Sequence, residues 1–317
     1  MKYDLYFHND FDGHASAAVF LNFLKTRGDD VSSINPVDHE IRGQWPGLKP
    51  GNSFAVFDFY FHPRAKYFFD HHQTTFIKEE WKKKFKESSF YYLKPKYLSC
   101  CGLVGAMLKR DHQYLPNKNI KELMKWLDIV DGAKYKSAKQ AILMKEPALK
   151  INAYIDSAIK SGQKTDWIVE ELASKSIALI AKNPKIISFY EKTVNENKKS
   201  MIFYKKSLQI FMNTSFIDLS KTRVARLRTA PYFLQPKLLY NITIKNKDGG
   251  YRISIGSNPW INTRSKVDLG LILRRFCGGG GHYGAAGGFV KSKKEAQAVI
   301  DSVIFALTKK KYDGFRL

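Results

Sequence analysis

Acidic and histidine side chains end or follow three short apolar runs near the start of the chain. Mixed sets of carboxylate oxygens and imidazole nitrogens bind divalent cations, with Mn²⁺ favoured and Mg²⁺, Co²⁺ or Zn²⁺ as alternatives. Two such ions about 3.5–4 Å apart can activate water and stabilise both oxygens of a phosphoryl transfer. The candidate metal ligands in these runs are His8, Asp10, Asp12, Asp58, Asp70, His71 and His72.

The three apolar runs are expected to be strands that position these ligands. Residues 2–8, 53–58 and 66–70 have the composition of buried parallel strands. In an open parallel sheet, ligands bind beyond the carboxyl ends of the strands, so the three groups of side chains should converge there. We expect Asp58 to bridge two ions and to act in catalysis together with His71 and His72. Taken alone, Asp58 is better explained as a turn or helix-capping acid, and it is the combination with the other strand-end residues that favours a metal site.

A fourth segment offers two further acids, Asp128 and Asp131, at the end of an amphipathic helix. Either could complete the metal site, and Asp128 could instead be a charge on an exposed helix face. The sequence around these two positions leaves the choice open.

A run of four glycines before His282 is the second stretch with distinct chemistry. Successive residues without Cβ atoms let backbone amides approach an anion, and an imidazole can donate to a phosphate oxygen. We expect this loop to bind substrate and not metal. We also expect Gly280→Val to be harmful, because Gly280 should need φ > 0 and a valine side chain would block the close approach of a ligand. Arg264, shortly before, could bind a phosphate through its guanidinium. The candidate substrate-binding residues are Arg264, Gly279, Gly280, Gly281 and His282.

The pattern of elements predicts an α/β protein with two domains, residues 1–200 and 201–317. The first would hold a mostly parallel sheet and the second a smaller α/β unit. A hairpin turn is expected at Asp248-Gly249-Gly250. Helices are predicted at residues 15–25, 101–111, 119–130, 149–161, 267–276 and 293–309, a mostly helical stretch at 166–204, and further strands at 206–219, 237–245 and 251–256.

Composition gives a broad constraint on partners and location. The 53 Lys and Arg residues against 29 Asp and Glu give a net charge of +24. This excess favours an anionic partner such as nucleic acid, although a general lysine bias would produce it too. The three cysteines have neither disulfide nor zinc-site spacing, which is typical of a reducing cytoplasm. No apolar stretch long enough for a membrane span is expected.

These motifs resemble those of the DHH phosphoesterase superfamily over nearly the whole chain. The segment from His8 to Gly13 is similar to the first motif, Asp58 to the second, and Asp70-His71-His72 to the triplet that names the family. The segment from Asp131 to Tyr135 is similar to the fourth motif, and residues 278–287 resemble the DHH-associated C-terminal domain. The resemblance thus implies Asp131 as the fourth-motif ligand.

The resemblance implies two Mn²⁺ ions in the first domain, a substrate-binding second domain, and an active site in the cleft between them. The implied activity is a phosphodiesterase acting on short oligonucleotides or on linear or cyclic dinucleotides. The alternatives are a RecJ-like single-strand exonuclease, a phosphomonoesterase on bisphosphorylated adenosine, a polyphosphatase, and a non-catalytic nucleic-acid-binding protein. A monomer and a homodimer are both compatible with the sequence.

We predict that activity requires Mn²⁺ or a similar divalent ion, because the ligand set mixes carboxylates with imidazoles. Chelator-stripped protein should show no turnover of a phosphodiester, and added Mn²⁺ should restore it. Full turnover by stripped protein, with residual metal excluded by elemental analysis, would refute the metal requirement.

Overall fold

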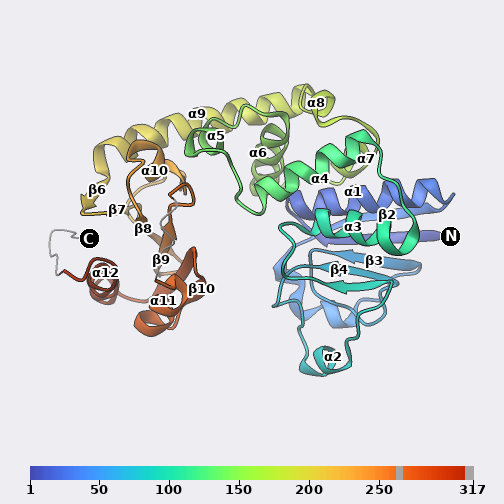
Figure 1. Cartoon of the computed structure of the whole chain (residues 1–317), viewed down its shortest axis with the longest axis horizontal. Coiled ribbons are helices and arrows are strands. Elements are labelled where there is room, and N and C mark those ends of the chain that lie inside the picture. Colours follow the sequence, from blue (N-terminus) through green and yellow to red (C-terminus); the bar gives the residue numbers. More distant parts are fainter. Residues whose placement is uncertain (262–266, 311–317) are drawn as a thin grey trace. The chain divides into compact units, whose positions relative to one another are not determined.

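The chain divides into two compact units in a computed structural model that describes residues 1–261 and 267–310, except the side chain of His282. The first unit contains Met1–Tyr135 and Met144–Thr193, and the second contains Lys136–Leu143 and Val194–Leu317. Each unit has its own sheet (Figure 1). The chain passes from one unit to the other within helix α9 (Pro184–Ser207). A domain boundary near residue 200 stays a prediction.

The first unit is built on a five-stranded sheet in the order β2-β1-β3-β4-β5, in which all neighbouring strands are parallel. The predicted parallel sheet is therefore confirmed. The strand order reverses direction between β1 and β3, which creates a switch point at the carboxyl ends of these two strands. The strands are β1 (Lys2–His8), β2 (Asp30–Val37), β3 (Ser53–Phe57), β4 (Tyr67–Asp70) and β5 (Tyr91–Leu93).

Helices cover one face of this sheet and enclose the larger hydrophobic core. Figure 1 shows α1, α3, α4 and α7 on this side of the sheet. Short helices and loops cover the other face, where Trp45, Phe61 and Trp81 belong to a second, aromatic core. The helical segments of this unit are α1 (Phe11–Thr26), η1 (His39–Gly43), η2 (Trp45–Gly47), α2 (Glu79–Lys84), α3 (Cys100–His112), α4 (Lys118–Val130), α6 (Pro147–Lys160), α7 (Trp167–Ser174), α8 (Ile177–Ile180) and the first part of α9.

Helix α1 begins at Phe11, four residues before the predicted start, because Asp10 is its N-cap. The Asp10 carboxylate accepts a hydrogen bond from the amide of Gly13 at 2.9 Å. A Cβ atom at Gly13 would lie 2.0 Å from the carbonyl oxygen of His8, so only glycine permits this close approach. The first turn of α1 is thereby packed directly against the end of β1.

The second unit has a mixed six-stranded sheet in the order β10-β11-β9-β8-β7-β6. Its apolar face carries Ile242, Ile253 and Ile255 and packs in one hydrophobic cluster with residues of α11 and α12. Only β7 and β8 are parallel. The elements are α5 (Ala138–Leu143), β6 (Gln209–Phe211), β7 (Thr214–Asp218), α10 (Ala230–Leu234), β8 (Tyr240–Lys247), β9 (Gly250–Ser257), α11 (Leu269–Cys277), β10 (Gly280–His282), β11 (Ala285–Val290) and α12 (Lys293–Thr308).

The four glycines form the end of α11 and the first strand of a hairpin, not an open loop. Gly278 is the left-handed C-cap of α11, with φ +62°. Gly281 has φ +146°, and a Cβ atom there would lie 2.4 Å from the carbonyl oxygen of Ala285. At Gly280, by contrast, φ lies outside the left-handed range and a Cβ atom would meet nothing within 4 Å. The expectation that Gly280 needs φ > 0 is therefore wrong, because the requirement falls on its neighbours.

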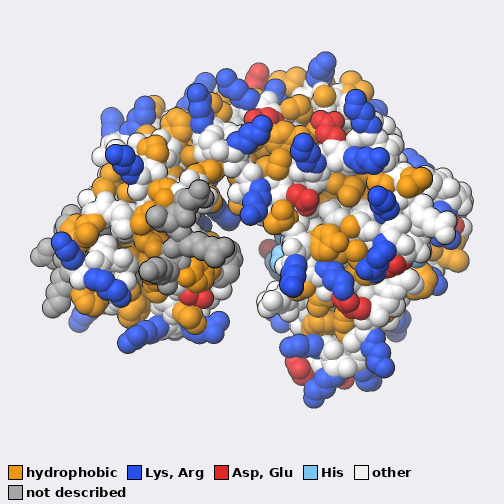
Figure 2. Space-filling model, viewed as in Figure 1, with side chains coloured by type: hydrophobic (Ala, Val, Ile, Leu, Met, Phe, Trp, Pro, Cys, Tyr) orange, Lys and Arg blue, Asp and Glu red, His pale blue; other side chains and the backbone are white. Residues whose placement is uncertain are grey.

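Basic side chains are spread over the visible face of the molecule and do not gather in one patch (Figure 2). Within residues 1–261 and 267–310, no helix is both long and apolar enough to cross a bilayer.

The hairpin geometry predicts that two glycine substitutions differ in their effect on the free energy of unfolding. Gly281→Val should lower the free energy of unfolding by about 2–3 kcal/mol or more, because a β-branched residue is strained at this φ and meets backbone atoms. Gly280→Val should change it by less than about 0.5 kcal/mol. Urea denaturation followed by circular dichroism measures both values. Equal destabilisation by the two variants would contradict the assigned geometry.

Candidate metal centre

The candidate ligands lie at the carboxyl ends of three adjacent strands of the first unit. His8 is the last residue of β1, Asp58 follows β3 directly, and Asp70 is the last residue of β4. The switch point between β1 and β3 thus places His8 and Asp58 beside one another, with 3.8 Å between His8 Nδ1 and Asp58 Oδ2.

Asp58 is held in an unusual backbone conformation at the centre of this cluster. Its φ is +54°, in the left-handed region that non-glycine residues rarely adopt and that costs about 1 kcal/mol or more. The amide of Asp58 donates to the carbonyl oxygen of Phe69 at 2.9 Å, which fixes this conformation. The side chain is almost fully buried. Strain of this kind persists where the surrounding structure imposes it, which is common at functional sites.

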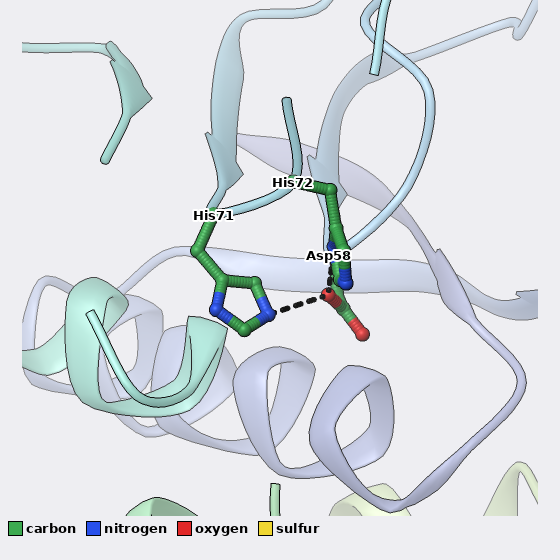
Figure 3. A group of neighbouring side chains, drawn as sticks. All are labelled: Asp58, His71 and His72. Atoms are coloured by element: carbon green, nitrogen blue, oxygen red, sulfur yellow. Dashed lines mark ion pairs between the residues drawn. The ribbon is translucent and has the colours of Figure 1, made fainter. Parts of the chain in front are cut away.

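Three overlapping groups of side chains each bring three potential ligand atoms within 4.8 Å of one another. Asp58 belongs to two of the groups, and His71 also belongs to two. Figure 3 shows both imidazoles of the triplet directed toward the Asp58 carboxylate. Asp58 is thus the carboxylate that two groups share, and its bridging of two ions stays a prediction. The groups are Asp58 with His71 and His72, His8 with Asp10 and Asp58, and Asp12 with His71 and Asp131.

The tautomer of His71 tests whether a cation fits this cluster. His71 Nδ1 lies 3.1 Å from the carbonyl oxygen of Tyr97, which can only accept, so Nδ1 must donate. In a neutral imidazole, Nε2 then presents a lone pair, 3.5 Å from both Asp58 Oδ1 and Asp131 Oδ2. His71 Nε2 and Asp58 Oδ1 are both buried without a hydrogen-bond partner. A cation between these atoms would satisfy both of them, so the cluster fits a divalent ion.

Asp12 is anchored by the first amides of α3. Its two oxygens accept hydrogen bonds from the amides of Cys100 and Cys101, at 2.6 and 3.0 Å. The partial positive charge of a helix N-terminus stabilises a carboxylate in this position. Asp12 Oδ2 also lies 3.7 Å from His71 Nε2, so α3 holds this acid against the cluster.

Asp70 faces His72 and belongs to none of the three groups in the described part of the chain. Its Oδ1 accepts a hydrogen bond from the His72 amide at 3.0 Å and lies 3.0 Å from His72 Nδ1. A carboxylate behind a ligating imidazole fixes the orientation of the ring. The contacts are those of a positioning residue, and direct ligation by Asp70 stays a prediction.

The structure distinguishes the two acids at the end of α4. Asp131 Oδ2 lies 3.5 Å from His71 Nε2 and within the third ligand group. Asp128 Oδ1 instead accepts a hydrogen bond from the Ser99 hydroxyl at 2.6 Å. Asp128 thus supports the start of α3, where Ser99 is the N-cap, while Asp131 faces the cluster.

The pKa values in the metal-free cluster follow from its crowded charges. Burial disfavours the charged form of both His8 and Asp58. The contact between these two side chains and their contacts with other imidazoles and carboxylates have the opposite, larger effect on both pKa values. The pKa of His8 rises to about 10 through Asp10 and Asp58, and that of Asp58 falls below its usual range. Asp58 and then Asp70 raise the pKa of His72 to about 11. Burial, followed by the charge of Asp58, raises the pKa of Asp131 to about 6. Protonated imidazoles therefore balance part of the negative charge of the carboxylates.

Two histidines near the cluster were not singled out from the sequence. His14 is fully buried, and its Nδ1 donates to the Asp10 carbonyl oxygen at 2.6 Å. Its Nε2 lies 2.9 Å from the Thr165 hydroxyl, so His14 positions the backbone of Asp10. His39 is exposed, with its ring 4.8 Å from that of His8. Their spacing from His8 carries no periodic signal, and only the fold brings them to the site.

Among the candidate substrate-binding residues, the backbone of Gly279, Gly280 and Gly281 is defined in the hairpin of the second unit. Arg264 and the side chain of His282 lie outside the described residues. The tight packing of Gly281 has a structural cause, whereas the open space at Gly280 leaves room for a ligand. A substrate-binding role of this segment stays a prediction.

Comparisons with known structures identify the fold. The pGpG-specific phosphodiesterase PggH from Vibrio cholerae matches with a TM-score of 0.72 and 17% identity, over 97% of this chain and 99% of that chain. A DHH domain described as a member of the s1p family of ribosomal proteins matches with a TM-score of 0.58 and 15% identity, covering 98% and 87%. Exonuclease RecJ bound to manganese matches with a TM-score of 0.54 and 14% identity, covering 98% and 90%.

No family model matches the sequence, and no curated protein matches it significantly. At these identities the structural matches show the fold alone. The fold is that of DHH-domain phosphoesterases, with a parallel five-stranded sheet in the first unit and a mixed sheet in the second. The resemblance of fold that the sequence motifs indicated is confirmed.

Metal binding to this cluster should compete with protons. Near pH 7.5, His8 and His72 are protonated in the metal-free protein, because their pKa values are about 10 and 11. Ligating imidazoles must be neutral, so Mn²⁺ binding should release about two protons and weaken as the pH falls. Calorimetric titration in buffers of different ionisation enthalpy counts these protons. Binding heat that is independent of the buffer would contradict the protonated state.

Proposed function

We propose that the chain is a divalent-metal-dependent phosphodiesterase that hydrolyses dinucleotides and very short oligonucleotides. The observation that carries this proposal is the pair of ligand groups sharing Asp58 at the strand switch point. Two divalent ions held there, most plausibly Mn²⁺, would supply a hydroxide nucleophile and neutralise the developing charge on phosphate oxygens. The manganese in the RecJ structure of the same fold supports the choice of ion.

The residues of the chain have separate tasks in this proposal. Asp58 would bridge the two ions, with His8 and Asp10 holding one of them. His71 and Asp131 would contribute from the opposite side of Asp58, with the Tyr97 carbonyl fixing the His71 ring. The metal-binding set would also include Asp12, Asp70 and His72. The residues that would bind substrate are Gly279, Gly280, Gly281, His282 and Arg264.

His72 is positioned to handle a proton. Its ring is about half exposed, with the exposed fraction of the side chain at 53%, whereas His71 is largely buried. Nδ1 of His72 lies 3.2 Å from Asp58 Oδ1 and 3.0 Å from Asp70 Oδ1. A half-exposed imidazole held in this way can exchange a proton with water, and it would give up that proton on ligating an ion.

A dinucleotide-sized substrate is favoured by the whole-length match with the pGpG phosphodiesterase. The excess of basic residues is compatible with any phosphate-rich substrate and does not select among them. The free, buried thiols of Cys100 and Cys101 support a reducing, cytoplasmic location for this activity.

A substrate panel tests the proposal. Manganese-loaded full-length protein would be assayed on pGpG, five-nucleotide RNA, thirty-nucleotide single-stranded DNA, cyclic diguanylate, bisphosphorylated adenosine and polyphosphate. We expect the highest kcat/KM on the linear dinucleotide. Preference for the thirty-nucleotide strand would favour the exonuclease alternative. Preference for the last two substrates would favour a phosphomonoesterase or polyphosphatase. Absence of turnover on all of them would leave a binding protein.

Substitutions at the cluster should separate ligands from neighbouring acids. Asp58→Ala, His71→Ala and Asp131→Asn should each lower kcat by about a thousandfold or more, because ligands of one metal pair act as a unit. Asp128→Asn is the matched control, since an amide oxygen still accepts from Ser99, and its kcat should stay within about threefold. Circular dichroism and metal content would accompany the kinetics. Loss of activity in Asp128→Asn with retention in Asp131→Asn would reverse the assignment of the two acids.

A further inference from the structure

His39 and Tyr60 lie at the same edge of the parallel sheet as the candidate metal ligands. His39 comes shortly after the end of β2, and Tyr60 comes shortly after the end of β3. In the strand order β2-β1-β3, these two strands flank β1, which ends at His8. The two aromatic side chains therefore border the metal centre on the side of His8, within the first unit of the chain.

The imidazole of His39 belongs to a group of closely spaced rings. Its centroid lies 4.8 Å from that of His8 and 5.7 Å from that of Phe59, to which it is nearly parallel at 14°. The ring of Tyr60 lies 5.3 Å from that of His39 and 4.7 Å from that of Phe59. These distances are typical of packed aromatic pairs. Phe59 is buried, whereas His39 is exposed. The group therefore presents an aromatic ring to solvent beside a candidate metal ligand.

The backbone that carries His39 is tied to the loop that carries the first metal ligands. Asn9 Nδ2 donates to Asp38 Oδ2 at 3.1 Å, and His39 is the next residue. On the core side, the buried ring of Trp45 contacts that of Phe59, with 5.1 Å between their centroids. An exposed ring that is already held in place loses little conformational freedom when a flat ligand packs on it.

Arg42 extends this aromatic surface. Its guanidinium carbon lies 5.5 Å from the centroid of the Tyr60 ring, and its side chain is exposed. A guanidinium on an aromatic ring offers a second flat and weakly hydrated surface. Nucleobases stack on aromatic rings and guanidinium planes in proteins that bind single-stranded nucleic acids.

We propose that His39, with Tyr60 and Arg42 beside it, stacks on a nucleobase of the substrate. The inference rests on the proposed function, because it places the base next to a phosphodiester bound at the metal centre. A stacking surface recognises flatness and ring area and not a hydrogen-bonding pattern, so purines should be favoured over pyrimidines. Phosphate compounds without a flat ring, such as polyphosphate, would gain nothing from this surface.

Calorimetric titration of the full-length, manganese-loaded protein with GMP and with ribose 5-phosphate tests the stacking surface. The two ligands share a sugar and a phosphate and differ in the base. The wild type should bind GMP about tenfold or more tightly than ribose 5-phosphate, and His39→Ala should lower this ratio of affinities by about fivefold or more. Effects on the phosphate and on the neighbouring metal ligand cancel in the ratio. An unchanged ratio in folded His39→Ala of equal manganese content, or no preference for GMP in the wild type, would overturn the proposal.

Three further variants separate stacking from other roles of His39. His39→Phe keeps a flat ring without the ring nitrogens, so its ratio should stay within about twofold of the wild type. His39→Leu keeps an apolar cover on Phe59 but has no ring, so its ratio should fall as in His39→Ala, and it replaces that variant if His39→Ala does not fold. Gln44→Ala is the matched control, because it removes an exposed side chain at the end of the same helical turn and should leave the ratio unchanged. A ratio lost in His39→Phe or kept in His39→Leu would refute stacking.

Steady-state kinetics on pGpG and on two analogues, each lacking one of the bases, identifies the stacked base. His39→Ala should lower kcat/KM by about fivefold or more on pGpG and on the analogue that keeps the stacked base, but not on the other analogue. An equal loss on all three substrates would contradict base stacking. If the wild type hydrolyses none of them, the proposed function fails, while the GMP titration still decides the stacking surface.

Discussion

Repulsion among carboxylates brought to one end of a parallel sheet is the constraint on which the first unit depends. Asp12 and Asp58 are almost fully buried close to His71, and Asp131 lies within the same contact distance. Burial alone would protonate such acids. Positive charge from the N-terminus of α3 and from three imidazoles opposes this effect, and it lowers the pKa of Asp58, while burial still raises that of Asp12. Strand order, the left-handed backbone of Asp58 and the early start of α1 all serve to hold these groups against their mutual repulsion.

Charge on the second unit is arranged in the opposite sense. There, the Nε atom of Arg226 is buried without a hydrogen-bond partner, and burial together with the charges of Arg228 and Arg252 lowers the pKa of this side chain.

Much of the fold was accessible from the sequence because its buried strands are plain apolar runs. The strand before His8 and the parallel arrangement were predicted with little error. The edge strand β2 was missed, since its polar residues and Pro36 obscure the pattern, and β5 is only three residues long. The hairpin formed by β10 and β11 was missed because glycine has no strand preference.

The site was predictable in its residue types but not in its supporting contacts. The position of His71 after an apolar run predicted it as a ligand. The Tyr97 carbonyl that sets its tautomer could not be predicted, because every residue type has a backbone carbonyl. The amides of Cys100 and Cys101, which hold Asp12, are equally invisible in the sequence. Asp128 and Asp131 differ by less than one helical turn, and only packing against Ser99 separates them.

The placement of all the candidate metal ligands in the first unit has an evolutionary consequence. Residues 8–131 supply the cluster, and the second unit has a hydrophobic core of its own. Replacements in the second unit can therefore accumulate without disturbing the chemistry of the first. A lineage built on this architecture can vary the second unit while inheriting the side-chain cluster of the first, a freedom that a single shared core would not allow.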